Sequence, residues 1–138
     1  MSLSYQALRR GALIGALVGV SAAGLLSPTL SQAAEVHHAG DISYLCGGVG
    51  QGSLKALQAR APEFNLGFWM VEGPQGAYLA DVPIHVMQHG KTVAQFTAGG
   101  PLCYLKAPAG RYTIVGLHKQ QERKIEMQTG NKNAYLRW

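Results

Sequence analysis

Charged residues are scarce in this sequence, and those present are scattered along it. Asp, Glu, Lys and Arg make up 14% of the 138 residues, with 12 basic side chains against 7 acidic ones. The basic residues form no cluster interleaved with aromatic ones, which is the pattern expected of a nucleic-acid-binding surface. We therefore expect no nucleic-acid partner.

Recognisable catalytic patterns are also lacking. No serine occupies a nucleophile elbow of the Gly-x-Ser-x-Gly type. The few carboxylates show no paired spacing that would mark a general acid and a general base. The sequence predicts a protein without enzymatic activity and without a cofactor.

Long apolar runs are confined to the N-terminus. Arg9 and Arg10 precede a charge-free stretch, residues 11–28, and the small-residue site Ser31-Gln32-Ala33 follows it. This order predicts a signal peptide over residues 1–33 that is removed on export, and so a periplasmic or secreted protein with no stable membrane span. Its removal lowers the formal charge from +5 to about +3 and leaves a chain long enough for one small domain.

Cysteine is limited to two residues, Cys46 and Cys103, both in the predicted mature part. In an oxidising compartment an even count favours a bridge, and only one pairing exists. Closing a loop of that length should stabilise the fold by about 4 kcal/mol if the bridge acts on the entropy of the unfolded chain. Two independent buried thiols are the alternative.

Glycine, by contrast, is concentrated in residues 47–52, Gly-Gly-Val-Gly-Gln-Gly. A dinucleotide loop needs G-x-G-x-x-G inside a βαβ unit, and a Walker loop needs Gly-Lys-Ser/Thr at its end; neither is present. We interpret the stretch as a sharp corner between a disulfide-linked strand and a helix. A weak anion site at the helix N-terminus, on Gly52 and Ser53, is the alternative.

The predicted secondary structure changes at Pro62, from a helix before it to strands after it. Residues 34–52 form an extended lead-in with one short strand at 42–45. A helix then begins with Ser53 as its cap and stops at Pro62, and its apolar positions, Leu54, Leu57 and Ala61, fall on one face.

After Pro62 apolar residues alternate, as strands require. His89-Gly90 predicts the turn of a hairpin spanning residues 81–97. Residues 53–138 are therefore expected to form the helix and one mainly β, seven-stranded antiparallel sandwich. The seven expected strands lie in the stretches 65–72, 80–88, 91–97, 101–107, 111–119, 123–129 and 133–138.

The run from "DVPIHV" through a turn glycine to "PAGRYTI" resembles the prealbumin-like, carboxypeptidase regulatory-like domain. "GGVG", "FNL" and "GAYLADV" are similar to small exported bacterial proteins that carry it. The resemblance implies a prealbumin-like/Ig-like β-sandwich, commonly a non-catalytic module. That fold also includes a 5-hydroxyisourate hydrolase of the transthyretin-like type with a functional C-terminal Tyr-Arg-Gly-Ser. This chain ends Tyr135-Leu136-Arg137-Trp138, which removes the main support for that activity.

Two further sets of residues are candidates for binding. His37 would be the third residue after cleavage behind Ala34, where it could capture copper or nickel together with the terminal amine, with His38 beside it. Cleavage behind Ala33, which the Ser31/Ala33 pair favours, makes His37 the fourth residue and breaks that geometry, and a solvated tail without metal is the alternative. Trp69 lies on the face of its strand opposite Phe68. It could stack on a sugar, anchor a protein partner, or pack beneath the helix.

These observations together predict an exported, non-catalytic module that serves binding, structural or interaction roles in the cell envelope. One alternative is binding of a carbohydrate or peptidoglycan fragment through exposed aromatics. Another is a periplasmic inhibitor or partner of an envelope enzyme. Pairing of edge strands could also produce a homodimer.

Overall fold

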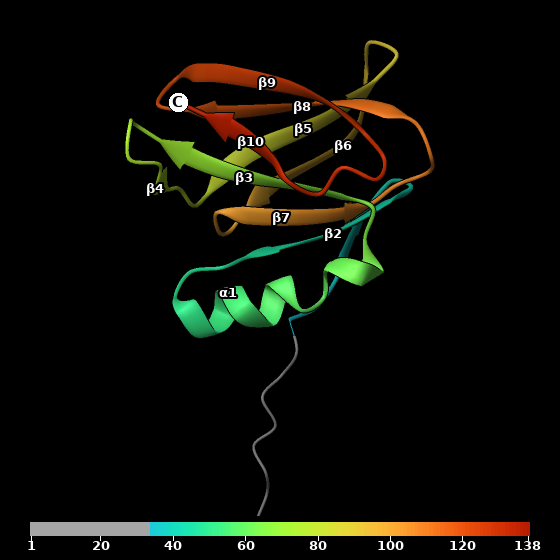
Figure 1. Ribbon diagram of the computed structural model, residues 1–138. Helices are drawn as coiled ribbons and strands as arrows, with labels where there is room; N and C mark the ends of the chain where they lie inside the picture. The colour runs from blue at the N-terminus through green and yellow to red at the C-terminus, as the bar shows by residue number, and fades with distance from the viewer. Residues whose placement is uncertain (1–33) are drawn as a thin grey trace, which may run out of the picture. The chain divides into compact units, whose positions relative to one another are not determined.

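The computed structural model describes residues 34–138, so the signal-peptide prediction for 1–33 lies outside the described residues. Ten strands form two sheets, accompanied by one α-helix and one 3-10 turn (Figure 1). The first sheet has the order β1-β2-β7-β3-β10, with the short β4 added to β3, and the second has the order β6-β5-β8-β9. The prediction of a mainly β fold with two sheets and one helix is confirmed.

The elements, in chain order, are β1 (His37–Ala39), β2 (Ile42–Gly47), α1 (Gln51–Gln58), η1 (Ala61–Glu63), β3 (Leu66–Glu72), β4 (Ala77–Tyr78), β5 (Val82–Gln88), β6 (Lys91–Ala98), β7 (Leu102–Lys106), β8 (Arg111–His118), β9 (Gln121–Gln128) and β10 (Ala134–Arg137).

The expected number of seven strands is too low. All seven strands expected after Pro62 are present, the short strand expected at 42–45 is β2, and β1 and β4 are additional. The extended lead-in is in fact a β1–β2 hairpin whose second strand lies inside the first sheet. β1 and β4 have only three and two residues, too few for an alternating pattern to be visible in the sequence.

The expectation of a wholly antiparallel sandwich is wrong, because one strand pair is parallel. β10 follows β9 of the second sheet, crosses to the first sheet and pairs with β3 in the parallel direction. The pairing sets Tyr135 opposite Trp69 and Arg137 opposite Val71.

Alternation along the strands builds the core between the sheets. On β3, Leu66, Phe68 and Met70 are fully buried and face Ile84 and Ile114 of the second sheet. The intervening residues Trp69 and Val71 point to the outer face of the first sheet, where they belong to a second apolar cluster. Each side of the first sheet therefore has its own core.

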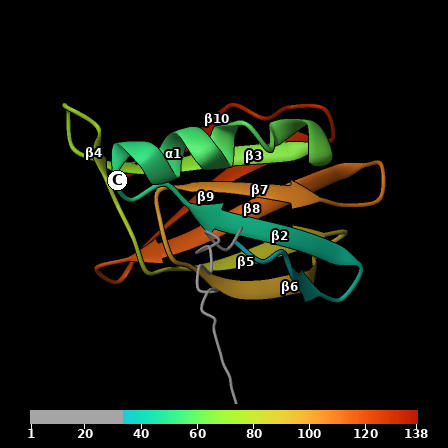
Figure 2. The same cartoon turned by 90° about the horizontal axis from the view of Figure 1, so that it is seen from below.

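Helix α1 covers part of that outer face (Figure 2). Leu57 is buried, and Leu54 and Ala61 pack against the second cluster, as the helical spacing predicted. The expected cap is wrong: Gly50 occupies the N-cap position, Ser53 lies inside the helix, and no side chain caps it. The helix also ends earlier than expected, at Gln58, and Pro62 belongs to the following turn η1.

The bridge between Cys46 and Cys103 is confirmed, and the described residues contain no free cysteine. The two residues are directly opposite each other on β2 and β7, with Cα atoms 4.1 Å apart. Cys103 lies in the core between the sheets. The disulfide thus links neighbouring strands of one sheet across its inner face.

Glycines shape the corner that follows β2. A Cβ atom on Gly100 would collide with the backbone of Gly47. The β6–β7 turn and the end of β2 are therefore so close together that only glycine fits at position 100. Gly48 has φ +99° and Gly50 has φ +88°, which L side chains rarely adopt. These contacts support the interpretation of the glycine stretch as a structural corner.

Tyr112 fixes the opposite end of the sandwich. Its hydroxyl donates a hydrogen bond of 2.7 Å to the carbonyl of Pro108, an arrangement known in β-sandwiches as a tyrosine corner. Its ring and the side chain of Ile114 are buried. Burial raises the pKa of Tyr112, and a hydrogen bond with Gln88 partly opposes this effect.

Candidate functional site

Trp69 lies at the centre of the most distinctive cluster of side chains on the outer surface. Its indole is only 9% exposed and belongs to the same cluster as Leu57 of the helix, Leu102 and Tyr104. Trp69 thus packs in an apolar cluster to which the helix also contributes, which supports the alternative that it packs beneath the helix.

Two tyrosines flank Trp69 from the neighbouring strands. The Tyr78 ring on β4 lies 5.5 Å from it at 23°, and the Tyr135 ring on β10 lies 6.2 Å from it at 14°. β4 and β10 pair with opposite edges of β3, because Val71 is opposite both Tyr78 and Arg137. One tyrosine ring therefore stands on each side of the indole.

Arg137 completes this group. Its guanidinium carbon lies 5.7 Å from the centre of the Tyr135 ring, within the range of a cation–π contact. Val71, which is almost fully buried, lies between Tyr78 and Arg137 in the sheet. We call the group of Trp69, Tyr78, Tyr135 and Arg137 the aromatic arc.

The tyrosines of the arc are exposed although the tryptophan is not. Tyr78 is 57% and Tyr135 45% exposed, and the other exposed large apolar side chains of residues 34–138 are Val49 at 67% and Leu117 at 42%. Val49 and Tyr78 both line a hollow of ≈ 260 Å³ beside the arc. The apolar surface thus continues from the arc to the glycine corner.

The C-terminal residues hold the arc in place. Trp138 donates from its backbone N–H to the carbonyl of Val71 (3.0 Å), and its carbonyl accepts a bond from the N–H of Gly73 (2.9 Å). The indole Nε1 of Trp138 donates to the carbonyl of Gln121 at 2.7 Å. Tyr135 and Arg137 lie on β10, which ends directly before Trp138. The bonds of Trp138 therefore fix the strand that carries Tyr135 and Arg137.

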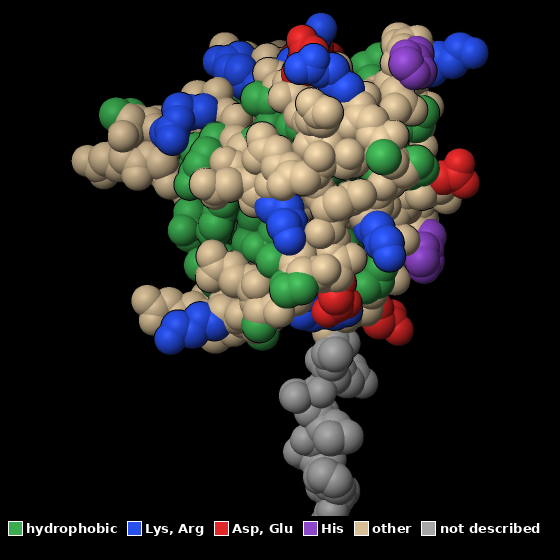
Figure 3. All heavy atoms as spheres, turned by 45° about the vertical axis from the view of Figure 1, so that its right-hand side comes forward, with side chains coloured by type: hydrophobic (Ala, Val, Ile, Leu, Met, Phe, Trp, Pro, Cys, Tyr) green, Lys and Arg blue, Asp and Glu red, His purple; other side chains and the backbone are tan. Residues whose placement is uncertain are grey.

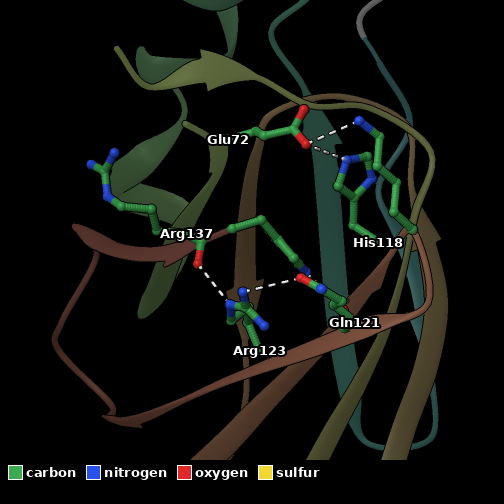
Figure 4. Close-up of polar contacts among 7 residues, drawn as sticks. Glu72, His118, Gln121, Arg123 and Arg137 are labelled. Carbon is green, nitrogen blue, oxygen red and sulfur yellow. Dashed lines mark hydrogen bonds and ion pairs between the residues drawn. The ribbon is translucent and has the colours of Figure 1, made fainter. Parts of the chain in front are cut away.

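Glu72 anchors the same region from β3. Its Oε2 lies 3.2 Å from Nζ of Lys119 and 3.3 Å from Nε2 of His118, at the β8–β9 turn (Figure 4). The hydrogen bond with Lys119 is the main cause of a lowered Glu72 pKa, and His118 contributes less. The ring centres of Trp138 and His118 are 5.6 Å apart, with the ring planes at 74°. This cluster is a clasp between the two sheets.

Arg137 stands apart from that clasp. In Figure 4 its side chain extends away from Glu72 and His118, while its backbone carbonyl accepts a 3.1 Å bond from Nε of Arg123. Its guanidinium makes one long bond, 3.4 Å, to the carbonyl of Gly73. None of the ion pairs among residues 34–138 includes Arg137.

The other predicted site residues are not brought to the arc. Gly52 and Ser53 lie exposed in the first turn of α1, and an anion there stays a prediction. His37 lies 5.4 Å from the Tyr44 ring, and Nδ1 of His38 is 3.0 Å from the Ser43 hydroxyl. Within residues 34–138 no three metal-ligating side chains come together, so capture at the N-terminus also stays a prediction.

The outer face of the second sheet offers a contrasting surface. A hollow of ≈ 230 Å³ there is lined by His85, Met87, Leu117 and Lys124. The lining of this hollow contains no Phe, Tyr or Trp.

Charge does not mark a separate site on the face shown in Figure 3. Lys and Arg side chains are spread over that face and do not gather in one patch.

Comparison with known proteins finds no matching family model, no matching curated protein and no matching solved structure. The resemblance to carboxypeptidase regulatory-like domains therefore stays a prediction. No helix among the described residues is long and apolar enough to cross a bilayer.

Proposed function

We propose that this chain is a non-catalytic binding module of the cell envelope, of the carboxypeptidase regulatory-like type, and that it binds another protein through the aromatic arc. The role fits a partner or inhibitor of an envelope enzyme. The observation that carries the proposal is the stacking of Trp69 between two exposed tyrosines, with Arg137 beside them. Trp, Tyr and Arg are the residues that dominate the binding energy of protein interfaces.

Rigidity favours this surface as an interface. Binding normally costs about 0.5–1.5 kcal/mol for each flexible side chain that becomes ordered. In the arc the rings already stack on one another, and the C-terminal bonds of Trp138 fix β10 in register with β3. The side chains of the arc are therefore already largely ordered in the free protein, so binding loses less conformational entropy.

A protein partner is favoured over a glycan because the two tyrosine rings stack on Trp69. A sugar stacks on a free ring face, whereas each side of the Trp69 indole is taken by a tyrosine. The arc also offers two exposed tyrosines with their hydroxyl groups and a guanidinium, which suit the mixed apolar and polar contacts of a protein interface.

Quantitative retention of proteins tests the proposal. The exported protein, purified with its disulfide intact, is immobilised and exposed to an envelope extract, as wild type and as the Tyr78→Ala/Tyr135→Ala double variant. Leu117→Ala is the matched control, because Leu117 is similarly exposed but lies on the other sheet. We expect at least one protein that wild type and L117A retain and the double variant loses at least about tenfold.

Equal retention by all three proteins contradicts the proposal. Binding to a glycan array that depends on Tyr78 and Tyr135, with no protein retained, would replace it with the carbohydrate alternative. Thermal unfolding of each variant confirms that the comparison is made between folded proteins.

A further inference from the structure

The hollow beside Tyr78 is uncharged throughout. Its lining consists of Gly48, Val49, Gly50, Tyr78, Leu79, Ala80 and Pro101. A cavity of about 150 Å³ accommodates benzene, so ≈ 260 Å³ has room for one large aliphatic or aromatic side chain. Because Tyr78 lines the hollow and also belongs to the arc, the two features form one continuous surface.

Arg137 supplies a charged binding group, in contrast to the uncharged hollow. Its guanidinium is always charged and has five donors, of which the structure engages one in a long bond to Gly73. Glu72, which follows the residue opposite Arg137 in the sheet, is held by Lys119 and His118. Arg123, bonded to the Arg137 carbonyl, adds a second positive charge nearby. A planar guanidinium in such surroundings favours a bidentate carboxylate.

From these two observations we infer that the aromatic arc binds an acidic peptide segment of its partner. A large apolar side chain of the segment enters the hollow at Val49 and Tyr78, and an Asp or Glu carboxylate pairs with Arg137. The inference rests on the proposed function and adds the chemistry of the partner to it. Charge complementarity favours this partner, because none of the ion pairs among the described residues includes Arg137.

A random dodecapeptide display library tests the inference with four forms of the exported protein: wild type, Arg137→Glu, Ala80→Phe and the control Arg111→Glu. Arg111 is an exposed arginine of the second sheet whose only ion pair among residues 34–138, with Glu126, is 4.0 Å long. Ala80→Phe fills the hollow without changing charge. Selection on Tyr78→Ala/Tyr135→Ala removes sequences that bind elsewhere.

We expect wild type to enrich peptides that combine Asp or Glu with Leu, Met, Phe or Trp. Those peptides should bind R137E at least about tenfold more weakly, and R137E should instead select Lys or Arg. R111E should select as wild type does. A80F should lose the preference for the large apolar residue but keep that for the carboxylate.

Peptides that depend on Tyr78 and Tyr135 but show no acidic preference, or the same preference with R137E, would overturn this inference and leave the proposed function in place. If no sequence is enriched on wild type over the double tyrosine variant, the arc does not bind peptide segments and this inference is overturned, whereas the proposed function is decided by the retention of envelope proteins.

Discussion

Trp69 of β3 and Tyr135 of β10 are directly opposite each other in a parallel strand pair, with ring centres 6.2 Å apart and ring planes 14° from parallel. The contact exists only because the chain returns from the second sheet and inserts β10 beside β3. The last strand therefore both completes the first sheet and builds half of its most distinctive surface. Contacts outside the arc stabilise the sandwich that carries it.

The disulfide is the first of these contacts. Replacing both Cys46 and Cys103 with Ala opens a loop of 57 residues and should lower the free energy of unfolding by about 4 kcal/mol. Urea unfolding of the double variant measures the loss, and reduced wild type serves as the control with the same expected midpoint. A loss below about 1 kcal/mol would show that the bridge adds little to the β2–β7 pairing.

Gly100→Ala should destabilise the protein by about 1–3 kcal/mol, because the added Cβ collides with the backbone of Gly47 and the corner must shift. Gly99→Ala is the matched control, since a Cβ there meets nothing within 4 Å. Thermal or urea unfolding of the two variants checks the difference. Similar stability of both would mean that the two turns do not approach as closely as the structure shows.

Tyr112→Phe removes the hydroxyl that donates to Pro108 and should cost about 1 kcal/mol of unfolding free energy. Tyr135→Phe removes a hydroxyl from an exposed ring and should cost much less. Urea unfolding at neutral pH compares the two. A neutral effect of Tyr112→Phe would rule out a stabilising role for the tyrosine corner.

The clasp should make stability depend on pH on the acidic side. Lys119, and to a lesser extent His118, hold the pKa of Glu72 below its ordinary value of 4.5. The stabilisation is therefore present above about pH 4.5 and is lost as the pH falls through the folded-state pKa. Glu72→Gln should be less stable than wild type near neutral pH, and the difference should shrink below pH 4.5.

Unfolding midpoints between pH 3 and pH 7 provide the measurement. Glu122→Gln removes the same charge from an exposed carboxylate that forms no ion pair among residues 34–138. A pH-independent difference for Glu72→Gln, or an equal effect of Glu122→Gln, would exclude the clasp as its origin.

Much of the fold follows from local patterns in the sequence. The alternation around Phe68, Ile84 and Ile114 identifies strands because one face of each is buried. The start of the helix was misplaced because Gly50, and not the better-known cap residue Ser53, occupies the N-cap. β1 and β4 were missed because pairing with longer neighbours, and not their own residues, makes them strands.

The candidate site was only partly predictable. Alternation places Trp69 on the outer face, and Tyr135 and Arg137 share a face because Leu136 between them is buried. Nothing in the sequence reveals that β10 pairs with β3 in parallel, so the stacking of Tyr135 on Trp69 could not be inferred. The disulfide was predictable because the count of cysteines allowed a single pairing.

Site-specific photo-crosslinking in living cells tests the central claim most directly. A photoreactive phenylalanine analogue is placed at position 135, at position 78 and, as the control on the other sheet, at position 117, all three being exposed. The account predicts a crosslink to the same protein from positions 135 and 78 and none from 117. A crosslink from 117 alone, or no protein adduct from 135 and 78 in folded, exported protein, would contradict it.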